Sequence, residues 1–482
     1  MAKRHARRGG GRRQPRSLLF EFPFTVPAPE MVDPGLGIRR FTRQGRDHSY
    51  TTDVTLLDTP DHRLIRSGVL LAHRVSDGLG EWYLAAPTWS PLLPEEHAVP
   101  VDAEGDLPEE LAELTRPFRR HAPLGPVAAM TLARDSYLVR GRPGSTPSDE
   151  DEERGRDEVL GSVRDDRITI RRGGVVISRS REVTIDAGPA MDGAQLGHLV
   201  TVLEAAGAAR VEGFPPLPER IGAPATGLTD LPEPNRARRG ETLEEFCCRL
   251  FAGDLRRIVA TDLRWRTGRI DTSAPLLDDL RAAYQHLRAL AGVLDPAWRE
   301  AVEEHLTVLL AGDADELDLH RHEDNYLWLL DGLVGAARAP RLGDQSGEPA
   351  KAVLKRLATV HLSIVSTRCD ALTDRSADAD WQAALAAARQ FALVAEVGAL
   401  AGSRKAQRVA RRAGKLAASL EPLAAGAPPI TAEQVLGMTA PQAFAAGREV
   451  ERELQTIALR RADFLGTWPR RRDRIGAGGG RS

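Results

Sequence analysis

The sequence is short of cysteine and of long apolar segments. Its 482 residues include three cysteines, Cys247, Cys248 and Cys369. Adjacent cysteines cannot easily pair with each other, and the three do not show the spacing of a metal site. We therefore expect a reduced setting and a cytoplasmic protein. No apolar run approaches the roughly 20 residues that a membrane helix needs, so we expect no membrane association.

Lysine is scarce as well, although basic residues as a class are not. Lysine and arginine together number 66, and the only lysines are Lys3, Lys351, Lys355, Lys405 and Lys415. The formal net charge of −2 excludes a protein whose whole surface attracts polyanions. Any polyanion site must therefore come from a local cluster, and we expect no specific nucleic-acid partner. Arginine suits such a cluster because its guanidinium makes bidentate contacts with phosphate.

Hydrophobic periodicity divides the chain into regions. Residues 17–212 carry strand-like alternation, 213–239 are rich in Pro, Gly and Arg without a period, and 240–470 carry long helical patterns. The chain is also too long for one ordinary core. We predict an α+β domain, a linker and an all-α domain. The basic segment 1–16 lacks the apolar stretch of a secretory signal, and we predict that it and the tail 471–482 are disordered.

The most distinctive stretch of the first region lies between residues 53 and 87. The DTPD sequence at 58–61 has the chemistry of a turn, because aspartate bonds its own backbone and proline fixes φ. Gly68 then opens an apolar strand, whose alternation puts Ala72 and Arg74 on one face. A glycine-rich turn follows, and a second strand begins at Trp82. The pattern predicts a hairpin behind a tight turn.

The order of these motifs closely resembles that of the CYTH domain, the triphosphate-tunnel family. That family shows a D-T-P-D turn, then A-G-x-x-L-R-x-R, a glycine-rich turn and W-x-L-K-x-P. The resemblance covers roughly residues 17–212 and implies an antiparallel β tunnel or barrel with flanking helices. It also implies that carboxylates inside the tunnel hold Mg²⁺ or Mn²⁺ while cations bind a triphosphate, whose phosphoanhydride bond is hydrolysed.

This sequence retains only part of the charged residues that the family's pattern contains. The cations that the resemblance assigns to phosphate binding and that are still present are Arg74 and Arg134. The carboxylates it retains for metal are Glu21, Glu182, Asp186 and one of the neighbours Asp165 and Asp166, taken here as Asp166. Other positions of the pattern have lost their charge, namely Leu19, Pro23, Ala72, Ala85, Ser162 and Thr184. We therefore expect a degenerate active site, although Mg²⁺ can bind through one or two carboxylates together with substrate phosphates.

The helical region, roughly 240–470, resembles the CHAD domain, which implies a bundle of two related four-helix halves that binds polyphosphate. One signature helix of that family matches residues 276–294, and a second matches 381–396. The phosphate-binding cations that survive in them are Arg281, Arg288 and Arg389, whereas other basic and histidine positions are replaced, for example by Asp278, Gln285 and Leu385. At the start of this region, Thr242 and Glu245 have the spacing of a helix capping box.

A basic stripe lies outside these signatures. Arg404, Arg408, Arg411, Arg412 and Lys415 recur at helical spacing and share one helix face. One interpretation is a solvated outer face whose charges pair with acids of neighbouring helices. The other is a phosphate-contacting face, because so many like charges repel unless a partner balances them.

Three functions stay open on the sequence. The first is binding of inorganic polyphosphate or another phosphate-rich ligand with little or no catalysis. The second is a divalent-metal-dependent triphosphatase that uses the surviving charges of the tunnel. The third is a scaffold whose helical domain binds a protein partner that the sequence does not identify.

Overall fold

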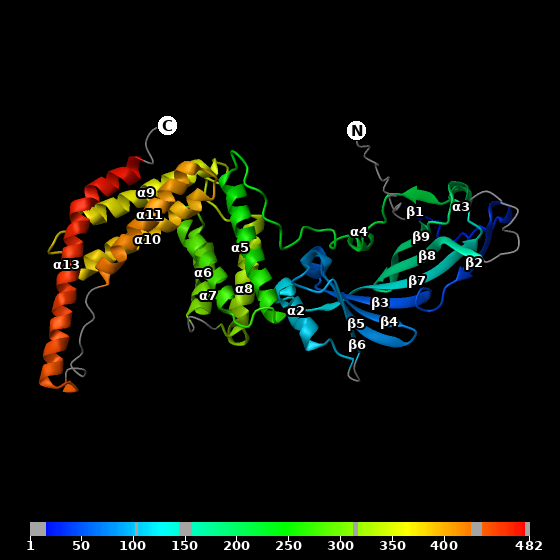
Figure 1. Cartoon of the computed structure of the whole chain (residues 1–482), viewed down its shortest axis with the longest axis horizontal. Helices are drawn as coiled ribbons and strands as arrows, with labels where there is room; N and C mark the ends of the chain where they lie inside the picture. Colours follow the sequence, from blue (N-terminus) through cyan, green and yellow to red (C-terminus); the bar gives the residue numbers. More distant parts are fainter. Residues whose placement is uncertain (1–15, 102–104, 144–156, 312–316, 426–435, 478–482) are drawn as a thin grey trace, which may run out of the picture. The chain divides into compact units, whose positions relative to one another are not determined.

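The computed structural model describes residues 16–101, 105–143, 157–311, 317–425 and 436–477. The chain divides into two compact units, with the boundary between Asp230 and Leu231 (Figure 1). The predicted tail 1–16 lies almost wholly outside the described residues. None of the described helices combines the length and the hydropathy that crossing a bilayer requires, and the three cysteines are free thiols.

The first unit is built on one 10-stranded antiparallel sheet in the order β10-β1-β9-β8-β7-β3-β4-β5-β6, with β2 also paired to β7 (Figure 1). The strands are β1 Arg16–Glu21, β2 Ile38–Arg43, β3 Tyr50–Asp58, β4 Leu70–Ser76, β5 Leu79–Ala85, β6 Glu96–Pro100, β7 Gly125–Gly141, β8 Glu158–Arg172, β9 Val175–Ala187 and β10 Ala209–Val211. Its helices are α1 Arg63–Arg66, α2 Glu109–Arg119, α3 Gly193–Ala205 and α4 Leu217–Ile221, with 3₁₀ turns at Pro34–Leu36 and Pro87–Trp89.

This architecture confirms the predicted fold class, an antiparallel sheet with flanking helices followed by a helical unit. The strands that the structure describes do not form the expected closed barrel. Among the described residues, the two end strands β10 and β6 pair with β1 and β5 and not with each other. The sheet is therefore open, and these strands do not close into a tunnel.

The two faces of the sheet differ in what covers them. One face packs against α3 through an apolar cluster that includes Phe20, Val183, Ile185 and Leu199. On the other face, the strands β3, β4 and β7 bury apolar side chains against α4, whose Ile221 is 4% exposed. The same face carries Asp166 on β8 and Glu182 on β9, which lie opposite each other, and we call the part of the face around these two residues the charged sheet face.

The DTPD turn holds α1 at the edge of this sheet. The buried carboxylate of Asp58 accepts hydrogen bonds from the backbone N–H groups of Thr59, Leu64 and Ile65, at 2.6, 2.9 and 2.9 Å. Three otherwise unpaired donors of the turn and the short helix are thereby satisfied by one side chain. The turn chemistry predicted from the sequence is present, and it serves the fold rather than a site.

Part of the segment predicted as a linker, 213–239, is packed on the first unit. Helix α4 lies within it, and further on Ala225 and Asp230 are 3% exposed. Asp230 accepts a hydrogen bond from Arg66 at 3.0 Å and also pairs with the buried Arg120. Residues as far as Asp230 therefore belong to the first unit, because buried charge pairs and apolar contacts hold them there.

The second unit consists of helices in two groups. The first group contains α5 Leu243–Arg266, α6 Ala274–Ala289, α7 Pro296–Leu310 and α8 Leu319–Arg338, and the second contains α9 Ala350–Asp370, α10 Asp378–Ala399, α11 Arg404–Ala424 and α13 Ala440–Ala477. The second group shares a core around Trp381, Phe391, Phe464 and Trp468. Ile475 is also buried in this core, and α13 continues to Ala477. The tail that we predicted from residue 471 is thus helical as far as it is described.

The capping box predicted at the start of α5 is confirmed. The Thr242 hydroxyl accepts from the Glu245 backbone N–H at 3.2 Å, and the Glu245 carboxylate accepts from the Thr242 N–H at 2.9 Å. We expect Thr242→Ala to lower the free energy of unfolding of this unit by about 1 kcal/mol. Urea unfolding followed by far-ultraviolet circular dichroism measures this. Ser403→Ala is the matched control because Ser403 precedes α11 without making a capping bond; an equal loss in both variants would contradict the assignment.

Candidate functional site

The sheet register brings three of the four predicted metal ligands together. Glu21 on β1 lies opposite Glu182 on β9, and Glu182 lies opposite Asp166 on β8. Directly opposed residues on adjacent antiparallel strands have their side chains on the same face, roughly 5 Å apart. Asp186 lies further along β9, where its carboxylate accepts a hydrogen bond from Ser17 at 2.5 Å. The charged sheet face therefore contains a row of carboxylates, with Asp186 apart from the other three.

Cations lie beside these carboxylates. The guanidinium of Arg134 on β7 makes a bidentate pair with Asp166, at 2.7 and 2.8 Å, and donates to the Tyr50 hydroxyl at 3.1 Å. Arg164 approaches the same carboxylate at 3.2 Å. Sequence reasoning named Arg134 and missed Arg164 and Tyr50. Arg164 stands two residues before Asp166 on the same strand, so alternation could have placed it on this face.

The charge of Glu182 is balanced by an arginine that lies outside the sheet. Arg220 on α4 pairs with its carboxylate and donates to the Ser180 hydroxyl at 2.7 Å. Burial raises the pKa of Glu182, and the nearby charges of Asp166 and Glu21 act in the same direction, while Arg220 opposes them. No signal in the sequence indicated Arg220, because α4 lies in a segment without periodicity.

These residues do not fit a bound Mg²⁺ or Mn²⁺. Among the described residues, no three His, Cys, Asp or Glu side chains lie together in a group that could hold a metal ion. Both oxygens of Asp166 accept from Arg134, and Glu182 is engaged by Arg220. A carboxylate committed to a guanidinium is a poor donor for a cation, so we derive no reaction step through a metal here.

Asp165 points to the opposite face of the sheet. Its carboxylate accepts from the guanidinium of Arg181 at 2.8 and 2.5 Å, and that guanidinium also lies over the Phe22 ring. Asp165 and Arg181 are 8% and 2% exposed. Of the two adjacent aspartates, the structure therefore assigns Asp166 to the charged sheet face and Asp165 to a buried ion pair.

Arg74 lies at a separate part of the same face. It pairs with Glu81 at 2.6 Å and stacks on the Tyr83 ring, 3.6 Å from the ring centre. Burial, helped by a hydrogen bond to Glu96, raises the pKa of Tyr83 to about 12. Arg74 and Tyr50 both line a cavity of about 460 Å³. Tyr50 thus connects this cavity to Arg134, but the two predicted phosphate-binding arginines of the sheet each have a carboxylate partner of their own.

The predicted phosphate contacts of the signature helices are also engaged within the protein. Arg281 pairs with Asp278 at 2.8 Å, and Arg389 pairs with Glu421 at 2.5 Å. Arg288 donates to the Tyr284 hydroxyl at 3.3 Å. These three side chains therefore lie on α6 and α10 as predicted, but each has a partner on its own or a neighbouring helix.

The basic stripe of α11 differs from the predicted phosphate-binding arginines of the sheet, α6 and α10. Its residues are Arg404, Arg408, Arg411, Arg412 and Lys415, and we call them the α11 basic face. All are exposed except Arg412, which is half-buried and donates to the backbone carbonyl of Arg474 on α13. Within the part of the chain that the structure describes, none of the five forms a salt bridge with a carboxylate. The interpretation in which acids of neighbouring helices neutralise this face is therefore not supported.

Comparisons with known proteins give limited likenesses. No family model matches the chain. Two uncharacterized proteins of Mycobacterium tuberculosis strains are 29% identical over 133 residues, which is 27% of this chain and 26% of theirs. The chain therefore spans about a quarter of the length of these curated relatives.

Solved structures resemble the chain only at low scores. A candidate adenylate cyclase of Bacillus halodurans has 12% identity and a TM-score of 0.21, covering 38% of this chain and 96% of its own. A candidate adenylyl cyclase of Hippeastrum, described as having a dominant triphosphatase activity, has 11% identity and a TM-score of 0.21, covering 44% and 99%.

Removing the carboxylate that neutralises the charged sheet face should give that face an affinity for anions. We expect Asp166→Asn to raise the affinity for tripolyphosphate by about tenfold, because Arg134 and Arg164 lose their shared carboxylate partner. Isothermal titration calorimetry at low salt measures the change. Asp135→Asn is the matched control, since it releases Arg43 on β2 from a 2.7 Å pair with β7 on the opposite face of the sheet. An equal gain in both variants would mean that net charge alone is responsible.

Proposed function

We propose that this protein binds inorganic polyphosphate, or a polyanion of the same chemistry, on the α11 basic face, with little or no catalysis on the sheet. The observation that carries the proposal is the contrast between the two sets of cations. Arg74 and Arg134 on the sheet and Arg220 on α4 are each paired with a carboxylate, whereas the α11 basic face has no carboxylate partner among the described residues.

A row of like charges on one helix face favours a repeating anion as its partner. Like charges at a spacing of four residues destabilise a helix by a few tenths of a kcal/mol per pair, and a bound polyanion relieves that repulsion. Arginine is suited to the contacts because its fork of donors matches phosphate oxygens. Arg412 itself donates to the backbone carbonyl of Arg474, so the C-terminal end of α13 lies beside α11 at this position.

Binding of long-chain polyphosphate to the full chain tests the proposal. Five phosphate contacts should release counterions, so the logarithm of the binding constant should fall with the logarithm of salt concentration with a slope of about −3 to −4. Absence of binding even at low salt would overturn the proposal and favour the protein-interaction scaffold. Release of phosphate that depends on Mg²⁺ or Mn²⁺ would instead favour the triphosphatase alternative, and the same samples serve for both measurements.

A further inference from the structure

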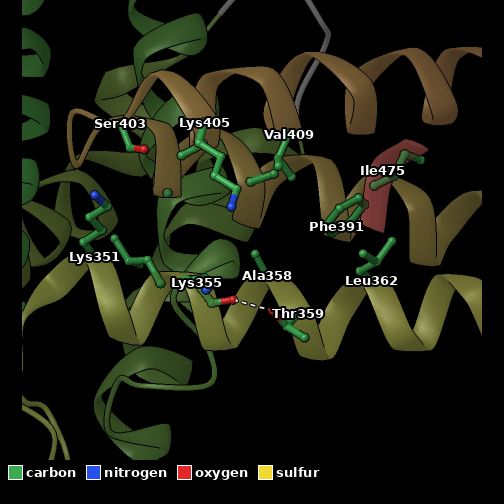
Figure 2. Close-up of a pocket in the computed structure, with 14 residues that line it drawn as sticks. Lys351, Lys355, Ala358, Thr359, Leu362, Phe391, Ser403, Lys405, Val409 and Ile475 are labelled. Carbon is green, nitrogen blue, oxygen red and sulfur yellow. Dashed lines mark hydrogen bonds between the residues drawn. The ribbon is translucent and has the colours of Figure 1, made fainter. Parts of the chain in front are cut away.

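A second, chemically different site lies in the same helical unit. Helices α9 and α11 both pack on α10. A pocket of about 280 Å³ opens between α9 and α11, with α10 also lining it (Figure 2). Small side chains on all three helices, such as Ala358, Ala395 and Ala406, leave this space, and Ile475 of α13 closes one end. The pocket is distinct from the α11 basic face, because none of the five residues of that face lines it.

The pocket has a cationic half and an apolar half. In Figure 2, Lys351, Lys355 and Lys405 lie spread over one half of the pocket, and Leu362, Phe391 and Ile475 lie in the other half. These are three of the chain's five lysines, and they come from two helices that are distant in sequence. Within the described residues none of the three forms a salt bridge, and the backbone carbonyl of Lys355 accepts from the Thr359 hydroxyl at 2.8 Å.

We propose that this pocket binds a single-chain amphiphilic anion, with its alkyl chain between Leu362, Phe391 and Ile475 and its head group among the three lysines. An apolar chain is favoured because it removes the exposed part of that lining from water. A carboxylate or phosphate head is favoured because three rotatable ammonium groups can converge on one anion without a fixed fork geometry. The volume is slightly below the usual range of about 300–1,000 Å³ for small-molecule pockets, so a two-chain lipid is too large.

The experiment compares octanoate, octyl phosphate and octanol on the full chain by isothermal titration calorimetry, below their aggregation concentrations. We expect both anions to bind at least about tenfold more tightly than octanol, and the stronger of the two identifies the head group. The double variant Lys351→Gln with Lys405→Gln should weaken the anions about tenfold and leave octanol unchanged. Arg368→Gln removes one exposed charge from α9 outside the pocket, so it should change the affinities less than about twofold.

A second variant tests the apolar half. Ala406→Phe, at a half-buried position of the pocket wall, should abolish binding of all three ligands by filling the space. Equal affinity for octanol and the anions, or an unchanged affinity in the lysine double variant, would overturn the proposal. Polyphosphate binding by the Lys351→Gln, Lys405→Gln variant tests the two proposals separately. If the α11 basic face is the polyanion site, this variant should still bind polyphosphate, even where its affinity for octanoate and octyl phosphate is lost.

Discussion

Replacing Asp165 with alanine should lower the free energy of unfolding of the first unit by about 3–5 kcal/mol. Asp165 and Arg181 form a bidentate ion pair in which both partners are at least nine-tenths buried. Removal of the carboxylate leaves the guanidinium of Arg181 buried among apolar groups such as Phe22, where a charge without an opposite partner is costly. Such a loss is a large part of the 5–15 kcal/mol that typically stabilises a domain.

Urea unfolding of the full chain measures this effect, with tryptophan fluorescence and far-ultraviolet circular dichroism followed together because the two units can unfold separately. Asp135→Ala is the matched control. Asp135 is also an aspartate on a central strand, and it also pairs with an arginine, Arg43, but that guanidinium is mostly exposed. Its loss should cost less than about 1 kcal/mol. Equal losses in the two variants would show that burial of the Arg181 pair contributes nothing.

The adjacent aspartates illustrate what strand alternation can and cannot predict. Alternation within β9 correctly placed Glu182 and Asp186 on one face, because it requires only the spacing of two residues. The choice between Asp165 and Asp166 required the register of β8 against β9, in which Asp166 lies opposite Glu182. A shift of one residue would exchange the two faces, and the sequence of β8 alone does not fix that register.

Partners that come from distant segments were beyond prediction. Arg220, which neutralises Glu182, lies on a five-residue helix in a stretch rich in proline and glycine. The fold class, an antiparallel sheet with flanking helices followed by a helical unit, could be predicted from motif order and periodicity, and so could the shared face of the α11 residues. Whether each charge meets a carboxylate depends on tertiary packing, and that decides which cations remain available for a ligand.

The triple variant Arg404→Gln, Arg408→Gln and Arg411→Gln should weaken polyphosphate binding by about 100-fold at low salt. Each substitution removes one exposed guanidinium that has no carboxylate partner among the described residues, so each removes one phosphate contact with its released counterion. The salt dependence should change as well. The slope of the logarithm of affinity against the logarithm of salt concentration should become less negative by about 2, since each contact contributes about 0.7.

A second triple variant with the same change in net charge makes the result specific. Arg281→Gln, Arg288→Gln and Arg389→Gln removes the cations of the signature helices, which already have partners in the protein. If exposed, uncompensated charge determines polyanion binding, this variant should lose less than about threefold in affinity. A larger loss here than in the α11 variant would move the site to α6 and α10. Similar losses in both would mean that binding follows net charge over the whole unit, since only a localised site distinguishes two variants of equal charge.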